Sequence, residues 1–165
     1  MKEQILRLLF AVFGRLPSFM RRGVIKTVSP NYTLGAVCFI RRPSDGAILL
    51  VRHSYTDRWG TVGGLSKRGE APHTAVTREA MEEIGLEIVL RGEPAVFVDA
   101  PKGRVDIIFD ALPSGDADLD SVGSTSPEIT KVEWFQPDAL PDMSAEAADA
   151  WTALERSGAR QSPSR

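Results

Sequence analysis

Apolar residues fall into short runs along most of the chain, and these runs indicate strands more often than helices. The segment 32–42, YTLGAVCFIRR, is almost continuously apolar, and the turn-forming sequence PSDG follows it. The run AILLVRH at 47–53 is then the predicted hairpin partner, whereas TDRWGTVGG at 56–64 has the composition of a loop. Further strands are predicted for segments 87–90, 95–100, 104–112 and 131–135.

Helical spacing occurs in the middle of the chain and near its end. Residues 72–84 are predicted to form a helix, because Pro72 suits a first turn and Gly85 a C-terminal stop. Its stripe of Val76, Ala80 and Ile84 should pack against the sheet. Residues 144–156 are predicted to form a last helix with Ser144 as its N-cap.

The order of these elements predicts an α/β or α+β sandwich built on a mixed sheet. We expect a basic N-terminal extension over 1–31, one domain over 32–156, and a flexible tail over 157–165. A chain of 165 residues is long enough for one domain with a core of its own.

Charge is distributed unevenly along the chain. The formal net charge is -2, which gives no general argument for binding nucleic acid, but residues 1–31 carry +5 and the remainder -7. Cys38 is the single cysteine and lies in an apolar run, so we expect a buried, unreactive thiol and a reducing, cytoplasmic setting.

The N-terminal segment predicts an amphipathic helix. Arg7 and Arg15 interrupt its apolar residues and no small-residue cleavage site follows, which argues against a signal peptide and a membrane span. Two interpretations remain: a helix packed on its own domain or a second subunit, as in a homodimer, or peripheral contact with an anionic membrane or an acidic protein. The apolar face would consist of Ile5, Leu8, Leu9, Val12 and Phe13.

The helix predicted at 72–84 gathers like charge near its C-terminal end. Glu79, Glu82 and Glu83 fall within an arc of about 100° of the helix. Their mutual repulsion and the helix dipole both disfavour this arrangement, which indicates a functional site. A hard divalent cation such as Mg²⁺ or Mn²⁺ would compensate the charge, and a solvated acidic face is the alternative.

The surrounding spacing favours the cation. The motif begins with Gly64 and has Glu70 six positions later; Arg78-Glu79, Ala80, Glu82-Glu83 and Gly85-Leu86 complete it. This pattern resembles the Nudix box, and the strand order resembles the Nudix fold from about residue 32 to 151. The resemblance implies a Nudix-type α/β/α sandwich.

The resemblance also implies a reaction and a division of roles. Nudix enzymes use Mg²⁺ or Mn²⁺ to hydrolyse a nucleoside diphosphate linked to another moiety, a small nucleotide-type substrate. By motif position, Glu82 and Glu83 are expected metal ligands, and Glu79 is a ligand or the base that activates water. The Gly63 carbonyl is expected to join the metal. Arg78 would orient the carboxylates, with Glu70 as its ion-pair partner and Gly64 and Gly85 as structural residues of the motif.

Candidates outside the motif are less specific. Glu128 stands in a loop before the last strand, where many Nudix enzymes place an acid that reaches the metals; a solvent-facing carboxylate is the alternative. Tyr55 is a candidate for stacking on a base, and Trp59 either stacks there or packs beneath the loop. The candidates for contact with substrate phosphates are Arg52, Arg58, Lys102 and Arg104.

Two departures from the family pattern stand near the motif. The usual Leu-Pro-Gly-Gly is Thr61-Val62-Gly63-Gly64 here, and Ala80 replaces a larger aliphatic residue. Neither removes an expected ligand, so we expect activity. A Nudix-fold module that binds a nucleotide without hydrolysis is the alternative.

Two further segments bear on ligands. Pro101 stands 15 residues after Leu86, as in some members that cleave ADP-ribose, although DAPKGRV also has the composition of a hairpin turn. Nucleoside triphosphates and nucleotide sugars therefore both stay open as substrates. The acidic run at 116–128 has Ser121 and Pro127 at the sixth and twelfth positions, where a calcium loop needs glycine and glutamate. We therefore interpret the run as an acidic surface loop.

Overall fold

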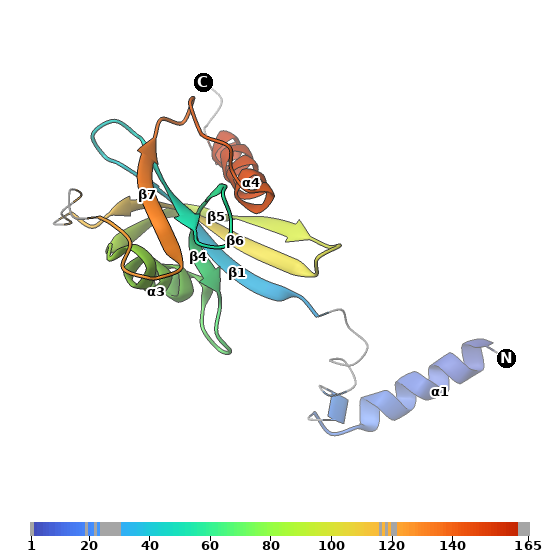
Figure 1. Ribbon diagram of the computed structural model, residues 1–165. Helices are drawn as coiled ribbons and strands as arrows, with labels where there is room; N and C mark the ends of the chain where they lie inside the picture. Colours follow the sequence, from blue (N-terminus) through green and yellow to red (C-terminus); the bar gives the residue numbers. More distant parts are fainter. Residues whose placement is uncertain are drawn as a thin grey trace. The chain divides into compact units, whose positions relative to one another are not determined.

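A mixed β-sheet with a helix on each face forms the unit from residue 33 onward, as the computed structural model shows (Figure 1). A second unit, residues 1–32, precedes it. The structure describes residues 2–18, 20–21, 23, 31–115, 117, 119 and 122–161.

The elements follow the predicted order closely. The helices are α1 (Lys2–Arg15), α3 (Pro72–Ile84) and α4 (Ala145–Gln161). The strands are β1 (Thr33–Arg41), β2 (Ile48–His53), β3 (Trp59–Gly60), β4 (Val62–Leu65), β5 (Ile88–Asp99), β6 (Arg104–Pro113) and β7 (Ile129–Phe135).

Strand β1 lies at the centre of the sheet. The main path is β3-β2-β1-β6-β5, with β4 paired to β1 and β7 paired to β2. The β1–β6 pair is parallel and the others are antiparallel. Since β1 pairs with both β4 and β6, it brings the glycines before α3 and the acidic residues of β6 to neighbouring positions.

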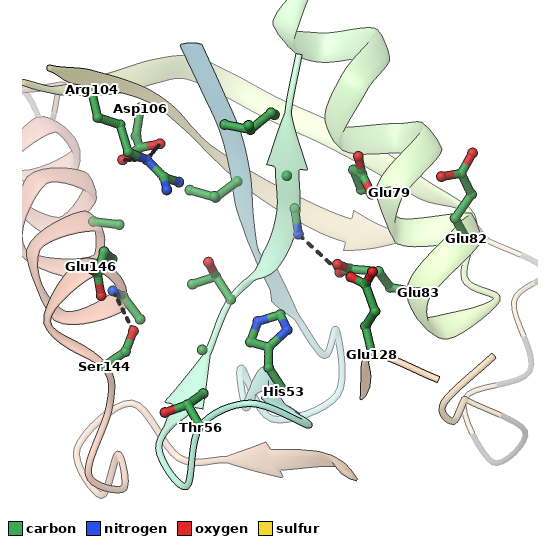
Figure 2. Close-up of a pocket in the computed structure, with 18 of the residues that line it drawn as sticks. His53, Thr56, Glu79, Glu82, Glu83, Arg104, Asp106, Glu128, Ser144 and Glu146 are labelled. Atoms are coloured by element: carbon green, nitrogen blue, oxygen red, sulfur yellow. Dashed lines mark hydrogen bonds and ion pairs between the residues drawn. The ribbon is translucent and has the colours of Figure 1, made fainter. Parts of the chain in front are cut away.

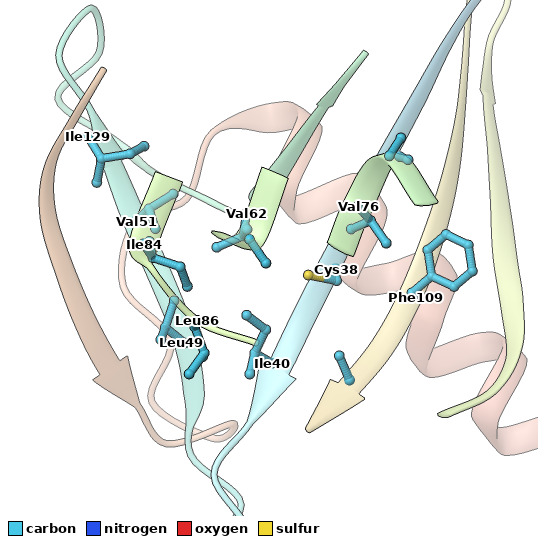
Figure 3. Close-up of a cluster of buried hydrophobic side chains, with 14 residues drawn as sticks. Cys38, Ile40, Leu49, Val51, Val62, Val76, Ile84, Leu86, Phe109 and Ile129 are labelled. Atoms are coloured by element: carbon cyan, nitrogen blue, oxygen red, sulfur yellow. The ribbon is translucent and has the colours of Figure 1, made fainter. Parts of the chain in front are cut away.

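Burial on both faces explains why β1 is a continuous apolar run rather than an alternating one. Cys38 and Ile40 point into the core beneath α3, together with Val76 and Ile84 (Figure 3). Val37 and Phe39 point into a second core, where they meet α4. The two cores confirm the α/β sandwich, and the buried Cys38 thiol has a pKa raised by desolvation.

Three element boundaries differ from the predictions. Segment 56–64 contains β3 and the start of β4 instead of a loop, because pairing with β2 and β1 orders it. The two strands predicted at 87–90 and 95–100 form one strand, β5, with a register shift between Arg91 and Ala95. Helix α4 continues to Gln161, beyond the predicted end at 156.

Helix α1 confirms the predicted N-terminal helix. The side chain of Ile5 is exposed and that of Phe13 is partly buried, whereas the side chains of Leu8, Leu9 and Val12 lie outside the described residues. Membrane, protein or dimer contact through this helix therefore stays a prediction. Within the described ranges, no helix is long and apolar enough to cross a membrane.

Candidate functional site

Helix α3 has the boundaries that the sequence predicts. Pro72 occupies its first turn, and Gly85 ends it in the left-handed conformation at φ 66°. Val76, Ala80 and Ile84 are buried against the sheet, and the Ala80 side chain has no exposed surface. In the close-up, Glu79 and Glu83 lie on the side of α3 that faces β4, whereas Glu82 points away from β4 (Figure 2).

Two glycines of β4 allow this close approach. Gly63 has φ 141° and pairs with Val37 of the neighbouring strand β1. A Cβ at Gly64 would lie 2.8 Å from Glu79 Oε1. Val62 stands at the position where the usual Leu-Pro-Gly-Gly sequence has its proline. Its side chain is buried and its backbone pairs with Cys38, so the residue at this position belongs to strand β4.

Arg78 connects the carboxylates of the motif. Its Nε and Nη2 donate to the two oxygens of Glu70 at 2.9 and 3.1 Å. Its Nη1 donates to Glu79 Oε1 at 2.7 Å and to Glu82 Oε2 at 2.9 Å. The Arg78 hydrogen bond lowers the pKa of Glu70 to about 2. The ion pair implied by the resemblance is present, and Arg78 supplies part of the compensating positive charge on α3.

Replacing Arg78 by lysine should therefore reduce activity without abolishing the fold. An ammonium group cannot bind Glu70 through two parallel hydrogen bonds while also holding Glu79 and Glu82. We expect turnover to fall about 10- to 100-fold and the midpoint of thermal unfolding to decrease. Arg68→Lys, at an exposed position on the loop before α3, is the matched control. Equal behaviour of the two variants would contradict the orienting role of Arg78.

Glu83 has a different environment from the other two acids. Only 6% of its surface is exposed, and its Oε2 accepts the Gly63 N–H at 3.2 Å. Desolvation is the largest cause that raises the pKa of Glu83 to about 7; the charges of Glu79, Glu128 and Glu82 act in the same direction, and the Gly63 hydrogen bond opposes them. Near neutral pH this buried carboxyl therefore keeps a large protonated fraction until positive charge arrives.

Glu128 approaches the same place from the loop before β7. Its backbone is fixed by hydrogen bonds, since its carbonyl accepts the Ser54 N–H at 2.7 Å and its N–H donates to Ser126 Oγ at 3.2 Å. The side chain lies near Glu83 in the close-up (Figure 2). The loop thus adds a fourth carboxylate to the three of α3.

A cavity of about 700 Å³ joins these residues to the opposite wall. The carboxylates of α3 form one side, whereas β6 and the start of α4 form the other with Arg104, Asp106 and Glu146 (Figure 2). His53 and Tyr55 also line the cavity, and the centroids of their stacked rings are 5.1 Å apart. One cavity therefore has the carboxylates of α3 and the residues of β6 and α4 in its lining.

The structure gathers most but not all of the predicted residues at this cavity. Gly63, Gly64, Arg78, Tyr55 and Arg104 line it, together with the four carboxylates already described. Glu70 pairs with Arg78 and Gly85 ends α3, and neither residue is part of the lining. Arg52, Arg58, Trp59 and Lys102 are not among the residues that line it.

Each of these four residues contacts another side chain of the protein. Trp59 is buried against Phe135 and has the Arg52 guanidinium over its ring at 4.9 Å, which matches the packing alternative and leaves no face for a base. Arg58 forms an ion pair with Asp142 at 3.4 Å, and Lys102 one with Glu146 at 2.6 Å.

The sequence analysis missed several polar or charged lining residues: His53, Thr56, Thr61, Lys67, Asp106, Ser144 as a cavity residue, and Glu146. Asp106 alone carried a signal, because an acid in the middle of the apolar run RVDIIFDAL is unusual in a buried strand. Ser144 does cap α4 as predicted, since its Oγ accepts the Ala147 N–H at 3.2 Å.

The donor atoms suit a hard divalent cation, although they are not yet arranged around one point. Within the described part of the chain, no three His, Cys, Asp or Glu side chains form a ready metal cluster. The Arg78 Nη1 group lies between Glu79 and Glu82, and Glu83 is turned to the Gly63 N–H. Carboxylate oxygens at a negatively charged, partly buried site fit Mg²⁺ or Mn²⁺ once these side chains rotate.

Comparison with known proteins points to one family. A sequence model of the NUDIX domain matches residues 31–155. A MutT-like protein of Streptomyces ambofaciens is 33% identical over 102 residues, covering 62% of this chain and 63% of that protein. A Bacillus subtilis (strain 168) protein provisionally named 8-oxo-dGTP diphosphatase is 30% identical over 112 residues, covering 67% of this chain and 70% of that protein.

Solved structures share the same fold. The crystal structure of a NUDIX hydrolase from Nitrosomonas europaea superposes with a TM-score of 0.66 at 20% identity, covering 82% of this chain and 77% of that chain. At this level of identity the likeness concerns the fold. The match with the Streptomyces relative spans less than two thirds of that protein's length.

Proposed function

Because the chain belongs to the NUDIX family, we propose that it is a divalent-metal-dependent pyrophosphohydrolase. Its substrate would be a nucleoside diphosphate linked to another moiety, which is hydrolysed at the diphosphate. The observation that carries the proposal is the convergence of Glu79, Glu82 and Glu83 with Glu128 on one cavity. A binding module without hydrolysis would not need this number of acidic groups.

The residues proposed to hold the cation are Glu79, Glu82 and Glu83, together with the Gly63 carbonyl. A bound Mg²⁺ or Mn²⁺ supplies charge neutralisation for the diphosphate and lowers the pKa of a coordinated water. The buried Glu83 favours binding of a cation, because ionising this carboxyl without positive charge is costly. Arg78 keeps Glu79 and Glu82 on the same side of α3.

Proton transfer requires a base that can reach the attacking water. Glu79 and Glu128 are both candidates, since each lines the cavity. Glu128 stands on a loop fixed by backbone hydrogen bonds, whereas Glu79 is held by Arg78 and occupies space that a side chain at position 64 would need. A positioned base contributes about 10²- to 10⁴-fold. Single Glu→Gln variants at both positions would identify it by the larger loss in kcat.

The substrate class follows from the cavity and from the relatives. The Bacillus subtilis relative carries the name of a nucleoside triphosphate diphosphatase, which favours a nucleotide substrate here. A cavity of about 700 Å³ has room for more than a diphosphate alone. Nucleoside triphosphates and nucleotide sugars such as ADP-ribose are the two groups to test.

Metal removal should abolish the activity reversibly. We expect the protein to cleave at least one compound in a panel of nucleoside triphosphates and nucleotide sugars with Mg²⁺ or Mn²⁺, with products resolved by chromatography. Excess EDTA should reduce turnover to the background rate, and added Mg²⁺ should restore it, because four acidic groups without a cation repel the anionic substrate. Full activity in EDTA, or nucleotide binding without cleavage of any compound, would contradict the proposal.

A further inference from the structure

The wall of the cavity opposite α3 contains a buried carboxylate over a glycine. The parallel register of β1 and β6 pairs Gly35 with Asp106. A Cβ at position 35 would overlap Asp106 Oδ1 and would lie 3.0 Å from Arg104 Nη2. The missing side chain of Gly35 therefore makes the space in which the Asp106–Arg104 pair lies.

Arg104 holds this carboxylate with only one of its nitrogens. Its Nε donates to both oxygens of Asp106, at 2.8 and 2.9 Å. Among the described residues, no hydrogen bond uses the two terminal NH₂ groups of Arg104. Asp106 is 6% exposed and yet lines the cavity, so the pair offers two acceptor oxygens beside unused donors.

The charge of this wall is unsuited to phosphate. Asp106 and Glu146 both line it, and each is paired with a cation, Asp106 with Arg104 and Glu146 with Lys102. Glu146 has a pKa lowered mainly by its hydrogen bond with Lys102, with a smaller effect from Arg104. Because the two carboxylates match the two cations, this wall has no excess positive charge for an anion and fits an uncharged group that carries hydrogen-bond donors.

Aromatic rings lie between this wall and the carboxylates of α3. Tyr55 stacks on His53 with an interplanar angle of 19°, and Tyr55 is 77% exposed. Desolvation raises the pKa of Tyr55, and nearby charges on both walls, from Glu128 and Glu83 to Glu146, raise it further. An exposed ring between the walls offers a stacking surface for a planar ligand.

We propose that Asp106, held by Arg104 over Gly35, binds the N–H donors of the substrate's nucleobase and so selects the nucleoside. The proposal rests on the proposed function, since it assigns the far end of the same cavity. A carboxylate accepts hydrogen bonds and cannot donate them. Guanine presents a ring N–H next to an amino group, with a carbonyl beside them for Arg104, whereas adenine places an acceptor next to its amino group.

Binding of reaction products tests this assignment without requiring hydrolysis. Calorimetric titrations would compare guanosine 5′-monophosphate, adenosine 5′-monophosphate and ribose 5-phosphate, each with Mg²⁺. The wild-type protein should bind the guanosine compound at least about tenfold more tightly than the other two. Asp106→Asn should remove most of that preference and leave the affinity for ribose 5-phosphate unchanged.

Asp110→Asn is the matched control. Asp110 lies on the same strand and pairs with an arginine, Arg41, at 2.7 Å, but it does not line the cavity. Its substitution should leave all three affinities unchanged. Gly35→Ala should act like Asp106→Asn, because the added methyl group displaces the carboxylate.

Three results would overturn the assignment. Wild-type protein that binds guanosine 5′-monophosphate no more tightly than ribose 5-phosphate would overturn it without any variant. An unchanged preference in folded Asp106→Asn protein would do the same, and an equal loss for ribose 5-phosphate would assign the carboxylate to the sugar. Base preference that depends on Asp106 in a protein that cleaves no diphosphate would support this inference while contradicting the proposed function.

Discussion

Replacing Glu83 by glutamine should reduce turnover at least about a hundredfold while stabilising the metal-free protein above pH 7. The loss of turnover follows from removing a proposed metal ligand. The gain in stability follows from burial, because the carboxylate is 6% exposed and ionises at a cost in the folded state. Glutamine has nearly the same shape and still accepts the Gly63 N–H, so the fold should be retained.

The sign of the pH dependence follows from the pKa of Glu83. The pKa rises from an ordinary 4.5 in the unfolded chain to about 7 on folding, so the folded state binds the proton more tightly than the unfolded state. The free energy of unfolding of the wild-type protein should therefore decrease as the pH rises from about 4.5 to about 7. The shift corresponds to about 3 kcal/mol at pH 8.

Urea unfolding in EDTA at pH 5 and pH 8 measures this effect. The difference between the two pH values should be smaller in Glu83→Gln than in the wild-type protein. Glu82→Gln is the matched control, since the Glu82 side chain is 56% exposed and its charge is the smallest of the causes that raise the pKa of Glu83: it should lose turnover but keep most of the wild-type pH dependence. Near-normal turnover of Glu83→Gln at saturating Mg²⁺ would contradict the ligand assignment, and unchanged stability at pH 8 would contradict the burial argument.

Replacing Gly63 of β4 by alanine should destabilise the fold more than a methyl group added to any other glycine between β4 and the start of α3. Gly63 has φ 141°, a conformation that residues with a side chain rarely adopt. A Cβ there would also lie 2.6 Å from Val37 Cα and overlap the Ala36 carbonyl, and neither backbone group can rotate away. We expect a loss of about 3 kcal/mol or more, together with loss of activity.

Gly69→Ala separates the two causes of this loss. Gly69 also has positive φ, 81°, but a Cβ there would meet no atom within 4 Å. Its substitution should cost about 1 kcal/mol, from the backbone conformation alone. Urea unfolding measures both variants. Similar losses for the two would show that the close contact between β4 and β1 does not contribute.

The central helix and its acidic residues could be predicted from the sequence because their determinants are local. Pro72 and Gly85 mark the ends of α3, and the apolar stripe marks its buried side. The motif residues all lie within positions 64–86, so their spacing in the chain was enough to indicate a shared surface. The continuous apolar run of β1 likewise predicts a strand buried on both faces, whose successive side chains enter the two cores in turn.

Segments without a periodic pattern were not predictable. TDRWGTVGG has the composition of a loop, and it forms β3 and β4 only because β2 and β1 supply hydrogen-bonding partners. Trp59 had two possible roles in the sequence, and its burial against Phe135 was decided by the path of β7 and α4.

The sequence by itself determined the order of the elements, the ends of α3 and the set of acids that this helix carries, since each depends on neighbours within one or two helical turns. Tertiary structure alone decided that Glu83 is buried while Glu82 is exposed, and that Asp106 and Gly35 meet across a parallel pair of strands. The desolvation of Glu83 and the composition of the opposite cavity wall both depend on residues that are far apart in the chain. The spacing of these residues in the sequence does not show that they are close in space.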